Sequence, residues 1–203
     1  IYMKNIKDCM KSRMKKRAEF VKAPYGYRIK DRQLVVEEME AFRVRSALKF
    51  VMDYLNNPPE YMVLEFIDYK KDTQHLVLNY EEAANSIPYS WICRQVGKEI
   101  ELREQYFQAG EDISLLALQN VMELSFTEVE SHWSNQGNLM RSAGIWAKRL
   151  RKMPASVYYA GVVTARTKSY SEELRYIGNY EPIISKEQFD ALNKRVNETV
   201  FVD

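Results

Sequence analysis

Residues 37–55, EEMEAFRVRSALKFVMDYL, carry the clearest structural signal in the chain. Apolar side chains recur there at alternating spacings of three and four residues, at Ala41, Val44, Leu48, Val51 and Leu55. This period places them on one face of an α-helix, and the two glutamates at the start stand where the helix dipole favours anions. We therefore predict an amphipathic helix over 37–55 that packs this face into a core and ends before Asn56-Asn57-Pro58-Pro59.

The segments on either side of this helix favour short β-hairpins. Tyr27 to Val36 is an extended stretch with a polar Lys30-Asp31-Arg32 at its centre. Tyr61 to Tyr69 and His75 to Tyr80 are rich in β-branched, leucine and aromatic residues and flank a polar stretch, which is the pattern of two paired strands. We predict one hairpin before the helix and one after it.

Further along the chain, helical patterns dominate. Residues 98–108 and 112–124 predict two helices that are separated by a break at Gly110, whereas residues 81–97 show no clear pattern. The expected fold class is therefore α+β and mainly helical, with small β-hairpins.

The region after residue 124 has the outline of a helix-turn-helix. Ser125 and Glu128 have the spacing of a capping box at a helix start, and Gly137 follows as a helix stop. We expect Ser142 to cap a second helix that ends before Pro154. Two short helices joined by a glycine-containing turn, the second of them basic, are typical of a helix-turn-helix DNA-binding core. The basic residues of the second helix are Arg141, Lys148, Arg149, Arg151 and Lys152.

Two more elements are expected toward the end of the chain. Val157 to Thr164 is rich in residues that favour a strand. Ser185 to Gln188 has the spacing of a second capping box, which predicts a last helix with its apolar residues, Phe189, Leu192 and Val196, facing inward.

Charge is strongly segregated along the sequence, although the formal net charge is only +2. Residues 1–33 hold eleven Lys or Arg and three Asp or Glu, and residues 60–130 hold five basic and fourteen acidic residues. Residues 131–171 hold seven basic residues and no acidic one. Mixing the signs would lower self-repulsion, so two basic blocks separated by an acidic block indicate polyanion binding at the basic blocks. We expect the two blocks to meet on one concave cationic surface.

Composition excludes several classes of protein. The two cysteines, Cys9 and Cys93, are far apart and form no CxxC motif, so neither a disulfide framework nor a cysteine-based zinc site is indicated. We find no signal peptide and no apolar run long enough to cross a bilayer, and we expect a cytoplasmic chain that does not contact a membrane. The sequence begins at Ile1 within a helical pattern, as expected of a piece of a longer protein.

Catalytic patterns are weak. Glu65, Asp68 and Lys70 loosely match the carboxylate and lysine set of metal-dependent nucleases, but this spacing is common by chance. His75 and His132 are isolated histidines and are better explained as structural residues. We therefore predict no catalytic residue, no metal site and no cofactor in this chain.

Four groups of residues resemble the recombinase (DNA-binding) domain of the large serine recombinases, the serine integrases and transposon resolvases. They occur in the order found in that family. They are Ala23-Pro24-Tyr25-Gly26-Tyr27 with Leu34, Glu40-Ala41 and Val44-Arg45; Val129 with Trp133-Ser134 and Gly137; Trp146 and Leu150 with Val157-Tyr158-Tyr159-Ala160-Gly161; and Tyr180-Glu181-Pro182-Ile183-Ile184-Ser185 with Gln188-Phe189.

The resemblance covers about residues 1–56 and 124–199 and implies a domain organisation. Residues 1–22 would be the C-terminal part of the long helix that links a separate catalytic domain, and residues 23–203 would be the recombinase domain, with residues 57–123 as an insertion atypical of the family. Tyr180 stands where the family commonly has histidine. The implied parent is a self-associating serine recombinase of a bacterial or phage mobile genetic element, associated with the nucleoid.

The resemblance and the charge pattern together suggest which residues contact double-stranded DNA at an attachment site or transposon end. In the family, the linker follows the minor groove, which assigns the first basic block and the residues after it to the DNA backbone and minor groove: Arg13, Lys15, Lys16, Arg17, Lys22 and Arg28. The second block would enter the major groove with Arg141, Ser142, Lys148 and Arg149 and contact phosphates with Arg151 and Lys152. Arg141 or Arg149 would discriminate bases, because arginine can bind guanine O6 and N7 together.

Other interpretations stay open. The basic faces could be merely solvated, and one of these arginines could cap the C-terminus of a helix. Trp133 and Trp146 are better explained as core residues than as base-stacking residues. The chain could also be a helix-turn-helix transcription regulator, or a protein-interaction module built on the acidic residues 57–123.

Overall fold

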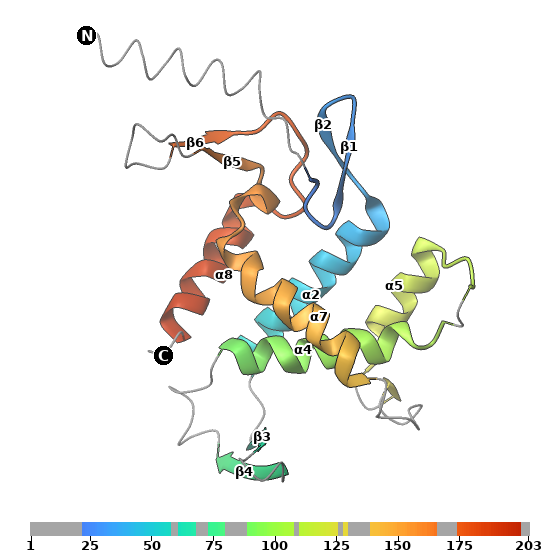
Figure 1. Ribbon diagram of the computed structural model, residues 1–203, viewed down its shortest axis with the longest axis vertical. Coiled ribbons are helices and arrows are strands. Elements are labelled where there is room, and N and C mark those ends of the chain that lie inside the picture. Colours follow the sequence, from blue (N-terminus) through green and yellow to red (C-terminus); the bar gives the residue numbers. More distant parts are fainter. Residues whose placement is uncertain are drawn as a thin grey trace.

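The structure, a computed structural model, describes residues 22–57, 61–67, 73–79, 89–107, 110–125, 128–129, 139–165 and 174–199. Within these residues the fold is mainly helical, with three two-stranded antiparallel sheets. The helices form the centre of the molecule, the β1–β2 and β5–β6 hairpins lie at one end of it, and the β3–β4 hairpin lies at the other end (Figure 1). The expected α+β, mainly helical class is thus confirmed.

Helix α2 (Glu38–Asn56) is the predicted helix and lies at the centre of the core. All five apolar residues predicted to face inward are buried. The side chain of Glu37 caps its start by accepting a hydrogen bond from the N–H of Glu40 at 2.9 Å. The periodicity of the sequence therefore predicted both the helix and the face that it buries.

The hairpin before α2 is also confirmed, with β1 (Tyr27–Lys30) paired to β2 (Gln33–Val36). Asp31 and Arg32 both have positive φ, 50° and 63°. Two successive left-handed residues form the tight connection whose twist matches that of paired strands. After α2, β3 (Tyr61–Ile67) pairs with β4 (Thr73–Asn79), which confirms the second hairpin.

The middle of the chain contains two described helices on either side of Gly110. Helix α4 (Tyr89–Glu104) begins well before the predicted residue 98, and α5 (Leu115–Glu123) lies within the predicted residues 112–124. The first part of α4, with Tyr-Ser-Trp-Ile-Cys at 89–93 and Gly97, consists largely of residues with low helix propensity, so the local sequence gives little sign of this helix start. The hydroxyl of Ser114 caps α5 by accepting from the N–H of Ala117 at 3.1 Å.

Helix α7 (Leu139–Lys152) lies along α4 and ends before Pro154, as predicted. Its start differs from the prediction, because Ser142 lies inside the helix and does not cap it. Leucine, methionine and arginine, which favour helices, occupy the three positions before Ser142. The helix therefore extends through them, and a serine cannot act as the N-cap from its interior.

The predicted strand over Val157 to Thr164 is wrong in its first half. Val157–Ala160 form a 3-10 turn (η2), which follows another, η1 (Met153–Ala155), and Gly161 then adopts a left-handed φ of 75°. Strand β5 (Val162–Ala165) begins only there and pairs with β6 (Leu174–Ile177). The turn buries Tyr159 and lets its carbonyl accept hydrogen bonds from the N–H groups of Ile183 and Ile184.

Helix α8 (Lys186–Thr199) confirms the second capping box, with Ser185 and Gln188 exchanging hydrogen bonds of 3.0 and 3.1 Å and the three predicted apolar residues buried. Ser125 and Glu128 form the first one in the same way, and Val129 is buried beside it.

Two predicted features fall outside the described residues: the helix over residues 1–20, and the stretch after Val129 that holds His132, Trp133 and Gly137. Within the described part of the chain, every helix is too short or too polar to traverse a lipid bilayer.

Candidate nucleic-acid interface

Helix α7 exposes a cationic stripe along its outer surface. Lys148 and Lys152 are exposed. Ile145, which lies three residues before Lys148, is 60% exposed. Ala147 and Leu150 are buried on the opposite side of the helix. Because successive residues turn by about 100°, positions 145, 148 and 152 share one outward direction. The two lysines and Ile145 therefore form one outward-facing stripe of the helix.

The inner face of α7 is held firmly against α4. The hydroxyl of Tyr89 in α4 donates a hydrogen bond to the carbonyl of Leu150 at 3.1 Å. Cys93, one turn later, is fully buried, and burial raises the pKa of its thiol to about 12, so it stays neutral at this contact. The cationic stripe is thus presented by a helix of fixed position.

Arg149 packs against two aromatic rings. Its guanidinium carbon lies 3.5 Å from the ring centroid of Tyr25 and 4.6 Å from that of Trp146. The two rings meet edge to face, with centroids 5.6 Å apart and an interplanar angle of 86°. Arginine binds an aromatic face by cation–π attraction. Arg149 therefore ties the turn that contains Tyr25 to α7.

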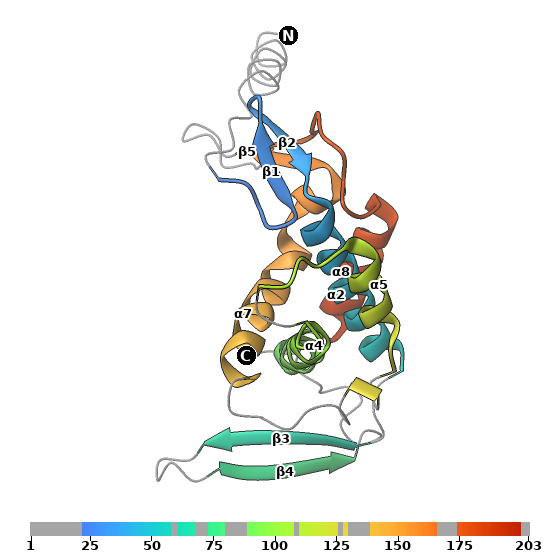
Figure 2. The same ribbon diagram turned by 90° about the vertical axis from the view of Figure 1, so that its right-hand side faces the viewer.

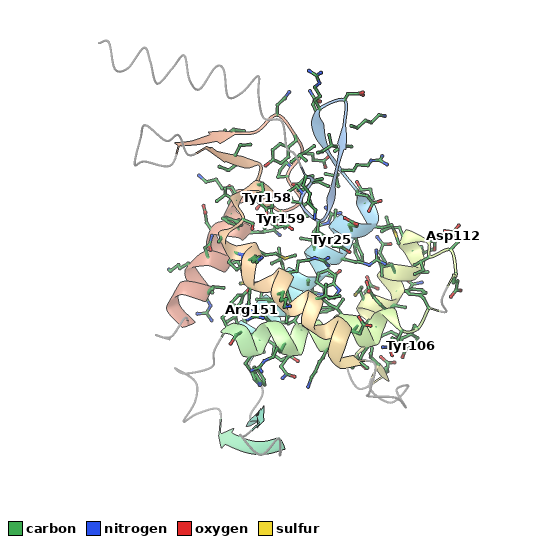
Figure 3. All side chains as sticks on the ribbon, viewed as in Figure 1. Tyr25, Tyr106, Asp112, Arg151, Tyr158 and Tyr159 are labelled. Carbon is green, nitrogen blue, oxygen red and sulfur yellow. The ribbon has the colours of Figure 1, made fainter. Side chains whose placement is uncertain are left out.

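Further tyrosines support this turn, and Figure 3 shows Tyr158 and Tyr159 close to Tyr25. The Tyr27 hydroxyl accepts from the N–H of Ile183 at 3.0 Å, and the Tyr159 hydroxyl donates to the carbonyl of Tyr25 at 3.1 Å. The Tyr180 hydroxyl donates to the carbonyl of Tyr158 at 2.9 Å. Burial raises the pKa of Tyr27 and of Tyr159 above the ordinary value for tyrosine, so both hydroxyls stay protonated.

Gly26 makes this arrangement sterically feasible. Its φ is +96°, its N–H donates to the carboxylate of Glu40 at 2.8 Å, and a Cβ there would come within 2.5 Å of Cδ1 of Ile183. Only glycine adopts this backbone conformation readily. Three of the segments that carry the family resemblance, 23–27, 157–161 and 180–185, therefore meet at one place in the fold.

Acidic groups gather on the other side of the molecule. Helices α7 and α5 lie on opposite sides of α2 and α4 (Figure 2). A pocket of about 280 Å³ on the α5 side is lined by acidic residues together with apolar and basic ones. Its acidic members are Asp53, Glu99 and Glu123. Because the pocket also contains Lys49 and Arg103, its acidic excess is small, and a polyanion is attracted more to the outer surface of α7.

Several acidic residues are also neutralised within the fold. Glu99 forms a 2.6 Å ion pair with Arg103, and the two side chains are only 9% and 3% exposed. Glu104 pairs with Arg43. Among the described residues, neither Lys148 nor Lys152 has an ion pair, so their charge is available to a partner.

The residues predicted to contact DNA are placed as follows. Lys148, Arg151 and Lys152 are exposed within the last two turns of α7, and Arg149 beside them is half-buried. Arg141 and Ser142 are described only through the backbone of that helix. Lys22 and Arg28 are exposed, Arg28 on the β1–β2 hairpin at one end of the molecule. The remaining ones, Arg13, Lys15, Lys16 and Arg17, lie outside the described residues.

Sequence reasoning missed two residues of this surface. Tyr25 is the ring that receives Arg149, and a separation of 124 residues gives no local signal for the contact. Ile145 is the second, because only the basic residues of this helix were selected from the sequence. Its position three residues before Lys148 and seven before Lys152 places it on the cationic stripe, and this spacing was the available signal.

The described residues contain no group of three or more His, Cys, Asp or Glu side chains that could hold a metal ion. The chain matches no known family model, no curated protein and no solved structure.

Proposed function

We propose that this chain is the DNA-binding module of a large serine recombinase, which positions an attachment site for strand exchange by a catalytic domain outside this chain. The observation that carries the proposal is the exposed cationic surface of α7, whose Lys148 and Lys152 have no ion pair among the residues that the structure describes. The family resemblance of the sequence supplies the recombination context. In this proposal α7 is the second helix of a helix-turn-helix whose first helix begins at the Ser125 capping box.

The dimensions of α7 suit the major groove. A helix of 14 residues is about 21 Å long, and the groove of B-form DNA, about 12 Å wide, admits an α-helix. Lys148, Arg151 and Lys152 follow one another along its C-terminal half, where flexible cationic side chains can reach phosphates on the groove walls. The acidic pocket on the α5 side would face away from the duplex.

Arg149 has a different task in this proposal from the base contact that the sequence suggested. Its guanidinium is stacked on Tyr25, and a stacked guanidinium retains in-plane N–H groups that can bind a phosphate. Tyr25 follows Lys22 by three residues. Arg149 therefore anchors the turn that follows Lys22, beside the helix proposed to enter the groove.

Binding to duplex DNA across a salt series tests the proposal. Each cation that releases counterions from the duplex adds to the slope of log affinity against log salt concentration. We expect tight binding at low salt, a steep slope, and a slope lower by about one for Lys148→Ala and again for Lys152→Ala. Lys49→Ala is the matched control, because Lys49 is an exposed lysine at the acidic pocket. A weak or salt-independent interaction of the whole chain contradicts the proposal.

The competing transcription regulator predicts a different assembly state. A helix-turn-helix regulator recognises a palindromic site as a symmetric dimer formed through its own core. The proposed module instead depends on its full-length parent for self-association. Sedimentation of the chain should therefore show a monomer, and a stable dimer that binds two half-sites would favour the regulator.

A further inference from the structure

Ile145 is a large apolar side chain on the same outward stripe of α7 as two lysines. It is 60% exposed, and its neighbours along the outer stripe of α7 are Lys148 and Lys152. The buried side of the helix, with Ala147 and Leu150, points in the opposite direction. Folding gains little from an isoleucine at this position, since most of its surface stays in water.

We propose that Ile145 recognises a thymine through the C5-methyl group when α7 lies in the major groove. This inference rests on the proposed function and adds the identity of a base to it. Thymine presents a methyl group on the major-groove edge, and apolar side chains contact it in sequence-specific complexes. An exposed isoleucine on the face of a helix that enters the groove can make this apolar contact.

The surrounding charges favour DNA over a protein as the occupant of this surface. Lys148 and Lys152 lie about 4.5 and 10.5 Å further along the helix axis, given the rise of 1.5 Å per residue. Both follow the apolar contact toward the C-terminal end of α7 and supply cations that suit phosphates. A protein that covered Ile145 would have to desolvate both lysines or supply acidic partners for them, which is costly for an apolar interface.

Leu116 provides a matched comparison. It is 66% exposed, as large as Ile145, and lies on α5, near the exposed Glu111 and Asp112. Trimming it to alanine removes a similar apolar area from the side of the molecule proposed to face away from DNA. Any effect common to Ile145→Ala and Leu116→Ala is therefore unrelated to a base contact.

The experiment begins with selection of preferred duplexes from a randomised library by the whole chain, by Ile145→Ala and by Leu116→Ala. We expect the chain and Leu116→Ala to select the same motif, and Ile145→Ala to lose the preference at one A·T position. Uracil is then substituted for thymine at that position, which removes only the methyl group. Affinity should fall about fourfold for the unchanged protein, the value of one buried methyl group, and should not change for Ile145→Ala.

Each outcome decides between distinct conclusions. Salt-dependent binding with no uracil effect at any thymine of the selected site overturns the thymine contact but leaves the proposed function intact. Absence of salt-dependent binding removes both. If Ile145→Ala instead abolishes a self-association detected by sedimentation, and leaves base preference unchanged, the stripe is a protein interface and the inference is wrong. Equal thermal unfolding of the three proteins shows that the substitutions did not disturb the fold.

Discussion

In the described part of the chain, two arginines lie over aromatic rings, one on each side of the molecule. On the α5 side, Arg103 lies over the ring of Phe50, with its guanidinium carbon 4.8 Å from the centroid, and pairs with Glu99. On the α7 side, Arg149 lies over Tyr25 at 3.5 Å, and no hydrogen bond or ion pair to it is found among the described residues. The first guanidinium is almost fully buried and the second is half-exposed.

The difference shows where positive charge serves the fold and where it remains available to a partner. Arg103 donates to the carbonyls of Val121 and Met122 and so completes the C-terminal end of α5. Its charge is balanced by Glu99. The charge of Arg149, like that of Lys148 and Lys152, is not balanced by any described acidic group. The net charge of the whole chain cannot reveal this division.

Removing Arg103 should have the largest effect. Arg103→Met leaves the Glu99 carboxylate buried without its partner and the α5 carbonyls without their donor. Breaking a buried ion pair by removing one member costs about 3–5 kcal/mol, and chemical denaturation should show this decrease in the free energy of unfolding.

The double variant Glu99→Leu/Arg103→Met separates the two contributions. Removing the uncompensated charge should recover part of the lost stability, because an apolar pair can replace a buried ion pair. The remaining deficit reports the unsatisfied carbonyls. If Arg103→Met alone costs less than about 1 kcal/mol, the buried pair does not hold α5 in place.

Gly26→Ala is expected to have the next largest effect, on the α7 side. The added methyl group would clash with Ile183, and alanine is strained at a φ of +96°. We expect a loss of about 2 kcal/mol in the free energy of unfolding. Gly144→Ala is the matched control, because Gly144 lies within α7 and a Cβ there meets nothing within 4 Å. Since alanine favours a helix, this control should stabilise the protein by about 0.5–1 kcal/mol. Equal effects of both substitutions would show that the turn at Gly26 is not sterically constrained.

The elements of the fold differ in how far the sequence alone could predict them. Local signals sufficed for α2, for both capping boxes and for the first two hairpins, because spacing and turn residues act over a few positions. The start of α4 was missed because residues 89–93 and Gly97 have low helix propensity, and the packing of this segment in the core decides its structure. The turn at Val157–Ala160 was mistaken for a strand because valine and tyrosine favour strands, whereas the contact of Tyr159 with Ile183 decided the structure.

The candidate interface was predictable only in part, for the same reason. The basic composition of α7 and its end at Lys152 follow from local sequence, so Lys148, Arg151 and Lys152 could be selected. The role of Arg149 depends on Tyr25, which is distant in sequence and adjacent only after folding. A charge pattern identifies which residues are cationic, but tertiary packing decides which of them remain exposed.

Comparing Arg149→Ala with Lys148→Ala tests this distinction. The expected change in the free energy of unfolding is smaller than for Arg103→Met or Gly26→Ala. Loss of the stack on Tyr25 and Trp146 removes a cation–π contact, for which we expect a cost of about 1 kcal/mol in the free energy of unfolding. Lys148→Ala removes an exposed lysine and should change stability by less than about 0.5 kcal/mol. Denaturation of both variants measures the difference. Equal stabilities would mean that Arg149 is as free as its neighbour and would restore it as a candidate for base contact.

Raising the pH from neutrality should have the smallest effect on the free energy of unfolding. The groups responsible lie on the α7 side. Burial raises the pKa of Cys93 from 9.0 to about 12 and also raises the pKa of Tyr27 and Tyr159. Because these groups have a higher pKa in the folded protein, the unfolded chain loses its protons first as pH rises. Their contribution to the free energy of unfolding is therefore fully present below the unfolded pKa and declines as pH rises toward the folded pKa. Between pH 7 and 9 the loss should stay under about 1 kcal/mol, and it should steepen between pH 9 and 12. Denaturation across this range tests the expectation, and Cys93→Ala should make the decline shallower. A decline that Cys93→Ala leaves unchanged would place the titrating groups elsewhere, and the contact between α4 and α7 would then not depend on a neutral thiol.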